Sequence, residues 1–509
     1  MRRSSLRFNK NKMQSPSLPK AIASDVETNI KVVQERFGSP MDLVIRRITI
    51  GAHNHLCSLL YFDGLVDTEL VRQNVIEKLQ QTGSHQQASE SALVVDYLYQ
   101  EWGTVSDIKK VDTFADVLEE LLNGQTIFFM AGIGQALAVD TKGGETRSIE
   151  EPVSETLVRG PREGFVENIG INIALLRRYV NDPNLRFKTY QAGERSRKNL
   201  IVAYVEGVVH PDIVAEVNRR LKTMDTDNAL ESGYVEGWIE DSFLSPFPQI
   251  MNTERPDKTA AALLQGKVAI VLDGTPFVLI APMTLGSVFQ SPEDFYERWT
   301  VGTLLRLIRY FAAFVSLFLP GLYIALVSYQ QGLLPSKIAF SIAASREGVP
   351  FPVFFEAMMM VGTMELLREA GARLPKTIGQ TIGIVGGLVI GEAAVQAGIV
   401  SPIMVIVTAL TALGTFSIPT FSVAISFRLL RFAIMFAASF MGLYGVILAY
   451  IMINIHIVNL KTFGIPYATP FAPTIMRDWN DLVLRAPHTM MMRRPKYLQS
   501  KDSRRGEKT

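Results

Sequence analysis

One carboxylate stands in a stretch of the chain that is otherwise apolar and glycine-rich. Glu392 is the single charged residue in 377–400, a run long enough to cross a membrane as a helix. A charged carboxylate in hydrocarbon is costly, so it must face protein or water. Two interpretations stay open. In the first, Glu392 lies near a helix end or pairs with a buried arginine. In the second, it faces a water-filled space.

The residues around Glu392 divide this helix into two faces. At about 100° per residue, a glycine at every fourth position forms a slowly drifting stripe that lets another helix approach closely. The predicted packing residues are Gly379, Gly383, Gly387 and Gly391. The opposite, partly polar face spans an arc of roughly 100° and carries Thr377, Thr381, Val385, Leu388, Glu392 and Gln396. We expect neighbouring helices on the first side and a polar environment on the second.

Motifs for catalysis or metal binding are weak. His53, His55 and Cys57 stand close together, but no second cluster completes a set of four zinc ligands. Gly132-x-Gly134 lies between two predicted strands and is typical of a hairpin turn, and the Asp-Gly pair in 273–276 is first a turn signal. We therefore expect no enzyme activity, no cofactor and no metal site.

Apolar runs gather in the second half of the chain and predict several membrane spans. Stretches of about 18 or more nearly uncharged residues can cross a bilayer as helices, and four qualify: 310–329, 377–400, 403–427 and 432–460. Pro419 is expected to hinge or kink the third. A fifth stretch, 351–367, carries Glu356 and Glu365 roughly 180° apart on a helix, which favours an interfacial or bundle-facing helix over a second pore lining. Basic residues near both ends favour an even number of crossings, and four is preferred.

Composition places the soluble half in the cytoplasm. The net charge is +2, and no basic stripe with interleaved aromatic residues indicates nucleic-acid binding. The single cysteine, Cys57, excludes an internal disulfide and fits a reducing compartment. The basic amino terminus is followed by no apolar stretch and is not a secretory signal.

The soluble half contains an internal repeat. The run 59–66 matches 202–209, and each is an apolar strand that ends at an acidic residue and a glycine before an amphipathic helix. The run 121–124 matches 263–266, and each precedes a β-rich stretch with a glycine turn. The second copies follow the first by 143 and 142 residues. Two matched segments at nearly one offset predict two fused α/β subdomains.

The expected architecture is an α/β soluble amino-terminal region, built from two duplicated subdomains, followed by an α-helical transmembrane domain. The expected parts are a mobile basic arm (1–40), a first α/β subdomain (41–150), a connecting segment (151–184), a second α/β subdomain (185–300), a transmembrane helical domain of four or five spans (301–462) and a basic tail (463–509).

Four long stretches resemble the A-subunit family of spore germinant receptors, the GerA type of endospore-forming bacteria. They lie at 150–179, 245–282, 368–402 and 456–473, the last reading HIVNLKTFGIPYATPFAP. The resemblance extends over nearly the whole chain beyond the arm. It implies a receptor component in the inner membrane of the dormant spore, with a transporter-like B subunit and a lipoprotein C subunit as partners. It also implies a homo-oligomeric ring, such as a pentamer, that conducts cations once a nutrient is sensed.

With such a ring, the polar face of 377–400 becomes a candidate pore lining. Glu392 would attract cations, and Val385 and Leu388 would form an apolar constriction that gates by dewetting. Two other functions stay open. A secondary transporter subunit favours repeats among its spans, and we find none. A membrane-anchored receptor scaffold does not explain Glu392 and the polar face.

Overall fold

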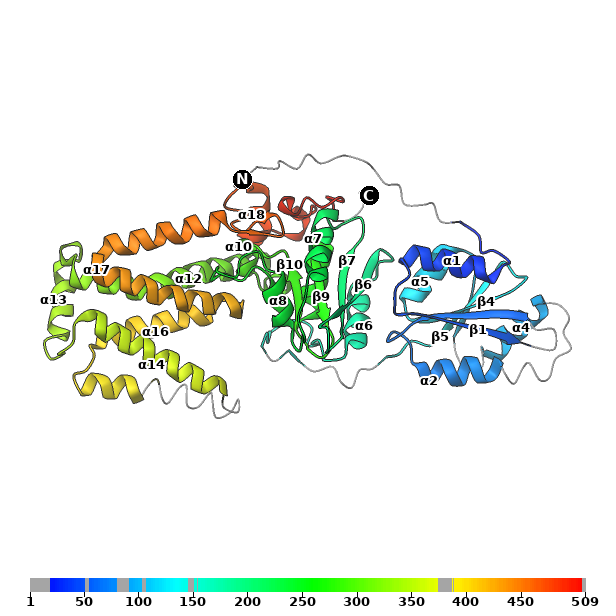
Figure 1. Ribbon diagram of the computed structural model, residues 1–509, viewed down its shortest axis with the longest axis horizontal. Coiled ribbons are helices and arrows are strands. Elements are labelled where there is room, and N and C mark those ends of the chain that lie inside the picture. Colours follow the sequence, from blue (N-terminus) through cyan, green and yellow to red (C-terminus); the bar gives the residue numbers. More distant parts are fainter. Residues whose placement is uncertain are drawn as a thin grey trace. The chain divides into compact units, whose positions relative to one another are not determined.

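The computed structural model describes residues 19–50, 55–79, 91–102, 107–144, 151–152, 154–373, 387 and 389–505. The chain folds into two compact units, one of residues 1–149 with 170–188 and one of residues 150–169 with 189–509 (Figure 1). The first unit holds the first α/β subdomain. The second unit holds most of the second subdomain, the helical domain and the carboxyl-terminal segment.

The first subdomain is an antiparallel sheet covered by helices on both faces. Its strands lie in the order β1 (Leu43–Ile50), β2 (His55–Phe62), β4 (Gln125–Met130), β5 (Ala136–Asp140) and β3 (Ile108–Val111). Its helices are α1 (Val26–Phe37), α2 (Thr68–Leu70), which continues as a π-helix (Val71–Glu77), α4 (Ser91–Trp102) and α5 (Phe114–Leu122). β2 is buried along most of its length, as expected for an inner strand packed on both sides. One core lies beneath α1 and α5, and a second lies beneath the π-helix and α4.

The second subdomain repeats this sheet strand for strand. Its order is β6 (Leu185–Ala192), β7 (Lys198–Val205), β9 (Val268–Leu272), β10 (Val278–Ala281) and β8 (Met251–Thr253). Its helices are α6 (Ile169–Tyr179), α7 (Pro211–Lys222), α8 (Ser232–Ile239) and α9 (Pro256–Gln265). Each strand has its counterpart at the same place in the sheet, and the helices follow in the same order along the chain, so the predicted duplication is confirmed. The repeat begins earlier than expected, because α6 corresponds to α1 and lies in the segment assigned as a connector.

Glycines at matching turns explain why the repeat is visible in the sequence. Gly64 and Gly207 have φ of 78° and 83°, and Gly124 and Gly266 have φ of 84° and 100°. Residues with a Cβ rarely adopt positive φ. Both copies therefore keep glycine at these two turns.

The helical domain follows the second subdomain. Its helices are α12 (Trp299–Ser328), α13 (Ser336–Ser345), α14 (Val353–Arg373), α16 (Pro402–Phe416) and α17 (Phe421–Asn459), and residues 389–396 are also helical. Within the described residues, α12 and α17 are long and apolar enough to cross a membrane, and α16 is a shorter apolar helix. α12 packs against both α16 and α17, and the largest apolar core of the chain surrounds it.

Two of the predicted spans are divided differently in the structure. The run 403–427 is broken, because α16 ends at Phe416 and α17 begins at Phe421. Pro419 lies between them, where it lacks an N–H and disfavours helix at the residue before it. α17 then extends through the predicted start of the next span at residue 432 and turns sharply at Gly442, with φ 57° and ψ −137°.

The turn at Gly442 makes α17 two helical arms, 421–441 and 443–459 (Figure 1). A Cβ on Gly445 would collide with the carbonyl of Ala437, which shows that the chain folds back at once. Each arm falls within the range of about 17–25 residues that crosses a bilayer. Of the other predicted spans, 310–329 coincides with most of α12 and 351–367 lies in α14. Most of 377–400 lies outside the described residues.

The expected basic tail instead folds onto the second subdomain. It contains β11 (Lys461–Thr462), β12 (Ile465–Pro466) and α18 (Met476–Leu482), and it buries Tyr467, Tyr497 and Leu498. Apolar side chains thus hold this segment in place, although its basic residues are its most visible feature in the sequence.

The end of this segment completes the second repeat. The backbone N–H groups of Lys501 and Asp502 donate to the carbonyls of Val208 and Gly207 at 3.3 and 3.2 Å. In the first repeat, the N–H of Gly143 donates to the carbonyl of Leu65, the counterpart of Val208, at 3.1 Å. A local segment satisfies this carbonyl in one copy and the far end of the chain does so in the other.

Candidate functional site

The candidate channel helix is described only in its carboxyl-terminal part. Four predicted pore-lining residues, Thr377, Thr381, Val385 and Leu388, lie outside the described residues, as do the packing glycines Gly379 and Gly383. The structure places Gly387, Gly391, Glu392 and Gln396.

Glu392 and Gln396 share one exposed side of the helical residues 389–396. Gln396 Nε2 donates to Glu392 Oε1 at 3.1 Å, one helical turn away. No ion pair joins Glu392 to another side chain among the described residues. The carboxylate therefore faces away from the other described helices of its chain.

The other side of the same helix packs into the bundle. Gly391 is buried, and a Cβ there would lie 3.4 Å from Val405 of α16. Ala394 and Val395 pack against the central apolar core. A Cβ on Gly387 would meet no described atom within 4 Å. Of the two described glycines in the stripe, one contacts a neighbouring helix of this chain and the other contacts no described residue there.

A buried polar cluster that the sequence analysis missed joins four helices. Arg428 of α17 pairs with Glu365 of α14 at 2.9 Å, and Arg431 lies 3.6 Å from the same carboxylate. Arg431 also donates to the carbonyl of Ser316 on α12 at 2.8 Å and to Oγ1 of Thr415 on α16 at 2.6 Å. Both arginines lie in the four residues, 428–431, that separate the predicted spans 403–427 and 432–460. Their spacing of three residues, which places both on one helix face, was the available signal.

Close helix approach accompanies this cluster. A Cβ on Gly414 of α16 would lie 2.6 Å from the carbonyl of Ala312 on α12. Ser316 and Thr415 share a hydrogen bond of 2.8 Å across the same contact. Small residues that allow two helix backbones to approach closely are typical of membrane helix packing. Within this chain, Gly414 has that role between α16 and α12.

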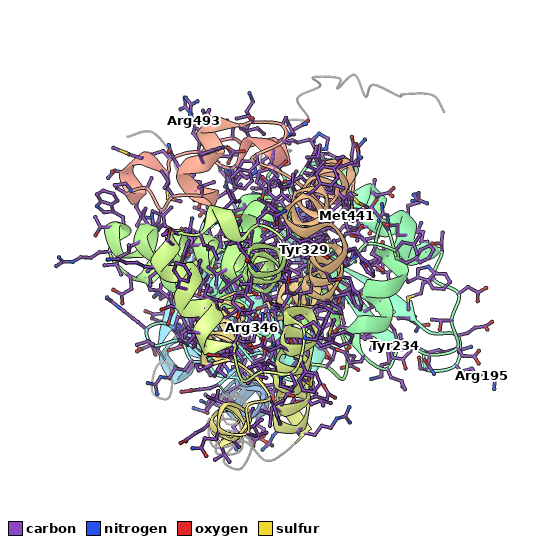
Figure 2. The ribbon with its side chains drawn as sticks, turned by 90° about the vertical axis from the view of Figure 1, so that its left-hand side faces the viewer. Arg195, Tyr234, Tyr329, Arg346, Met441 and Arg493 are labelled. Carbon is purple, nitrogen blue, oxygen red and sulfur yellow. The ribbon has the colours of Figure 1, made fainter. Side chains whose placement is uncertain are left out.

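Glu356 anchors a second cluster nearer the far end of the bundle. Its buried carboxylate accepts from the backbone N–H and the hydroxyl of Ser401 at 2.6 and 2.5 Å, and Ser401 caps the start of α16. Arg346 lies 3.5 Å from the other carboxylate oxygen, at the end of the helical domain that faces the viewer in Figure 2. Of the two expectations for this segment, the bundle-facing helix is the one observed.

A third cluster fixes the base of α12. The fully buried carboxylate of Asp294 pairs with Arg306 and Arg309, each at 2.7 Å. Arg485, from the carboxyl-terminal segment, donates to the Asp294 carbonyl at 3.2 Å, and burial together with Arg306 lowers the pKa of its guanidinium. The ring of Phe295 lies 5.3 Å from Arg306 and 4.8 Å from Arg485. The first long helix is thus tied to both the soluble subdomain and the chain's end.

This arrangement can be compared with known proteins. A family described as Bacillus/Clostridium GerA spore germination protein matches residues 31–497. Spore germination protein GerLA of Bacillus cereus is 48% identical over 474 residues, which cover 93% of this chain and 96% of that protein. Spore germination protein B1 of Bacillus subtilis (strain 168) is 42% identical over 475 residues, which cover 93% and 97%. The chain belongs to the GerA family.

Membership in the GerA family confirms the resemblance and gives the protein a role in spore germination. A solved neighbour is the crystal structure of the N-terminal domain of the A subunit of the Bacillus megaterium spore germinant receptor GerK3. It is 31% identical and covers 52% of this chain and 97% of that chain, with a TM-score of 0.42. With α12 and α17, this GerA-family chain has an α/β amino-terminal region followed by an apolar helical domain suited to a membrane.

Proposed function

We propose that this GerA-family protein is the A subunit of a nutrient-responsive germinant receptor in the inner membrane of the spore, and that several copies, such as five, form a cation channel. The observation that carries the proposal is the exposed pair Glu392 and Gln396 on a helix whose other side packs into the bundle. A carboxylate exposed to lipid is costly. Copies arranged around an aqueous pore would give this face water and give Gly387 a neighbour.

The proposed channel has two functional parts on one helix. Glu392 and Gln396, with Thr377 and Thr381, form the polar lining that attracts and hydrates cations. Val385 and Leu388 form an apolar ring, where a hydrated cation would lose its water against surfaces that offer no replacement oxygen. The nutrient signal would come from the transporter-like B subunit, with the lipoprotein C subunit as the further partner. The α/β half would lie in the cytoplasm.

A matched pair of valine substitutions tests the gate. Val385→Ala widens the proposed apolar ring, so spores that carry it should release cations without any nutrient. Val395→Ala is the control, because it makes the same change in the same helix on the side that packs into the core. It should lower receptor level modestly, in line with about 1 kcal/mol for a small cavity. Equal effects of the two substitutions would place Val385 in ordinary packing.

A second pair of substitutions tests the role of the Glu392 carboxylate. Glu392→Gln keeps a side chain that can bond Gln396 but removes the charge, so nutrient-triggered cation release should slow at unchanged receptor level. Glu369→Gln is the control, since Glu369 is an exposed glutamate paired only with Arg373 one turn away among the described residues. A normal release rate for Glu392→Gln would remove Glu392 from the conduction path.

One observation favours a secondary transporter subunit as the second candidate. The Glu365, Arg428 and Arg431 cluster lies inside the bundle, and buried charges within a membrane often mark substrate or ion pathways. A transporter would saturate at rates far below channel flux. Flux measured in proteoliposomes that hold the complete receptor therefore separates the two.

A further inference from the structure

The second subdomain contains a cavity distinct from the proposed channel. It has a volume of about 480 Å³ and lies between α9, α10 (Leu285–Val288), α11 (Glu293–Tyr296) and the carboxyl-terminal segment. Much of its wall is apolar, including Met251, Ala262, Leu264, Ile280 and Phe295. Cavities of this size and character hold small organic molecules.

Four cations line the cavity, and three of them are neutralised by carboxylates. The pairs are Lys258 with Glu155 at 2.6 Å, Arg494 with Asp502 at 2.6 Å, and Arg505 with Asp481 at 2.9 Å. The one carboxylate on the wall, Asp257, is bound by Arg255 at 2.9 Å. The remaining charge on the wall belongs to Lys267.

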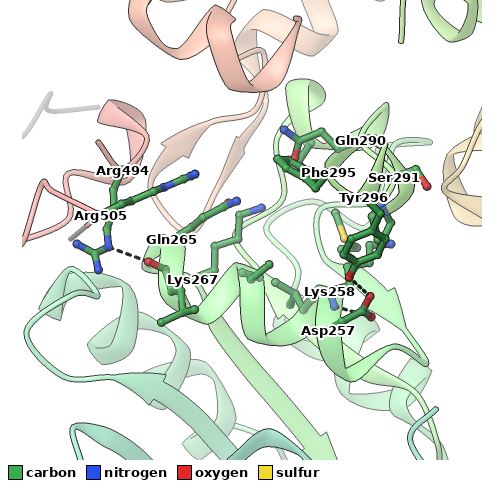
Figure 3. Close-up of a pocket in the computed structure, with 17 residues that line it drawn as sticks. Asp257, Lys258, Gln265, Lys267, Gln290, Ser291, Phe295, Tyr296, Arg494 and Arg505 are labelled. Atoms are coloured by element: carbon green, nitrogen blue, oxygen red, sulfur yellow. Dashed lines mark hydrogen bonds between the residues drawn. The ribbon is translucent and has the colours of Figure 1, made fainter. Parts of the chain in front are cut away.

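Lys267 is 3% exposed, and its ammonium has no hydrogen-bond or ion-pair partner among the described residues. Figure 3 shows its side chain in the middle of the cavity, with Lys258 and Asp257 at one end and Arg494 and Arg505 at the other. Burial, with a smaller effect of Lys258, lowers the pKa of Lys267 to about 8, although the Asp481 carboxylate, which pairs with Arg505, acts in the opposite direction. At neutral pH the group is still mostly charged. A buried, unpaired charge is strongly unfavourable, so this cavity lacks one negative charge.

We propose that this cavity binds a small organic monoanion whose carboxylate pairs with Lys267 and whose apolar body fills the wall beside Phe295 and Ile280. One unmatched cation calls for one negative charge. The apolar wall calls for a carbon skeleton, which a bare inorganic ion does not provide. Such a ligand would touch Phe295, whose neighbour Asp294 holds Arg306 and Arg309 at the base of α12.

The cavity is also closed by the end of the chain. Arg494 donates to the carbonyl of Leu264 at 2.7 Å, and Ser500 donates to that of Gln265 at 3.0 Å. Leu264 and Gln265 belong to the repeated segment 263–266. In the first subdomain the corresponding segment is 121–124, and no carboxyl-terminal segment closes over it among the described residues. The site is therefore a property of the second copy alone.

Calorimetric titration of the purified full-length chain tests the proposal with 1-naphthoate as the probe, alongside acetate and the neutral isostere 1-naphthamide. We expect naphthoate to bind at pH 7, and acetate and naphthamide to bind at least about tenfold more weakly. Affinity for naphthoate should fall about tenfold per pH unit above pH 8, because the bound form requires protonated Lys267.

Two variants complete the test. Lys267→Met keeps the length of the side chain and removes the charge, and it should abolish naphthoate binding. Lys222→Met, an exposed lysine at the end of α7, should bind like the unmodified protein. Thermal unfolding of both variants checks that each is folded. Absence of naphthoate binding, equal binding of naphthamide, or unchanged binding in folded Lys267→Met would each overturn the proposal.

Discussion

At the residue scale, the buried charge of Lys267 lowers the stability of the ligand-free fold and, in our proposal, provides the binding site for an anion. Its pKa of about 8 lies below the ordinary lysine value of 10.5 because the folded protein disfavours the charged form. Below pH 8 the lysine is protonated in both folded and unfolded chains, so the buried charge destabilises the folded state by its full amount. As pH rises from 8 towards 10.5, the folded state loses the proton first and the cost is relieved. Groups kept at such a cost are typical of binding sites.

Lys267→Met should therefore stabilise the ligand-free protein at pH 7, by on the order of 2 kcal/mol. The unmodified protein should gain stability relative to the variant between pH 8 and 10.5, where the difference closes. Thermal unfolding of both chains at a series of pH values in anion-free buffer measures this. A variant less stable than the parent at pH 7 would mean that the lysine packs favourably without a ligand.

At the element scale, α12 is held at several levels along its length. Asp294 binds its base, Ser316 meets Arg431 in its middle, and Tyr323 lies 3.4 Å from Ser401 farther along. The buried carboxylates and arginines in these contacts are paired, which is the condition for keeping charges inside a bundle. Movement of the soluble subdomain at Asp294 would thus act directly on a helix that contacts α16 and α17.

The carboxyl-terminal segment is a structural element of the second subdomain and should be required for its stability. Removal of residues 493–509 deletes buried Tyr497 and Leu498 and the hydrogen bonds to Val208 and Gly207. Loss of two buried side chains costs about 3–6 kcal/mol. We expect faster proteolysis of the second subdomain and a lower level of the protein, measured by limited proteolysis and immunoblotting. Removal of 506–509 alone is the control, and a full-length-like digestion pattern after the longer deletion would contradict the assignment.

At the scale of the whole molecule, Gly414 and Gly387 are expected to have different roles, one in the fold of the single chain and one in the contact between copies. Gly414 meets α12 within one chain, whereas a Cβ on Gly387 would meet no described atom of the chain. The polar side chains of Glu392 and Gln396 lie on the same helix as Gly387 and are exposed. In a membrane, a small residue beside an exposed polar face suits contact with another copy.

Gly387→Leu should weaken assembly while the single chain stays folded, because the added side chain would collide with no described residue of the same chain. Gly414→Leu should instead lower the stability of the chain itself by about 1–3 kcal/mol, since it forces α12 and α16 apart. Mass photometry of detergent-purified protein reports the oligomer, and thermal unfolding reports the fold. Normal oligomers of Gly387→Leu would remove this glycine from the interface between copies.

The sequence alone determined the features that depend on local chemistry. The duplication was visible because sharp turns at Gly64, Gly207, Gly124 and Gly266 need positive φ, and only glycine takes it without strain. The apolar run of α12 was visible because its length matches a bilayer. The break near Pro419 had a clear signal in the missing N–H.

Only the tertiary structure decided the features that depend on partners far along the chain. The sequence places Arg428 and Arg431 between two predicted spans. In the structure they lie inside the helical domain, where Glu365 pairs with Arg428 and Thr415 accepts a hydrogen bond from Arg431. The predicted basic tail, 463–509, gives no sign in its sequence that Tyr497 and Leu498 are buried against the second subdomain. Lys267 is one lysine directly after the repeated run 263–266, and only folding buries it without a hydrogen-bond or ion-pair partner among the described residues. Pairing and burial are non-local, so residue type and spacing do not fix them.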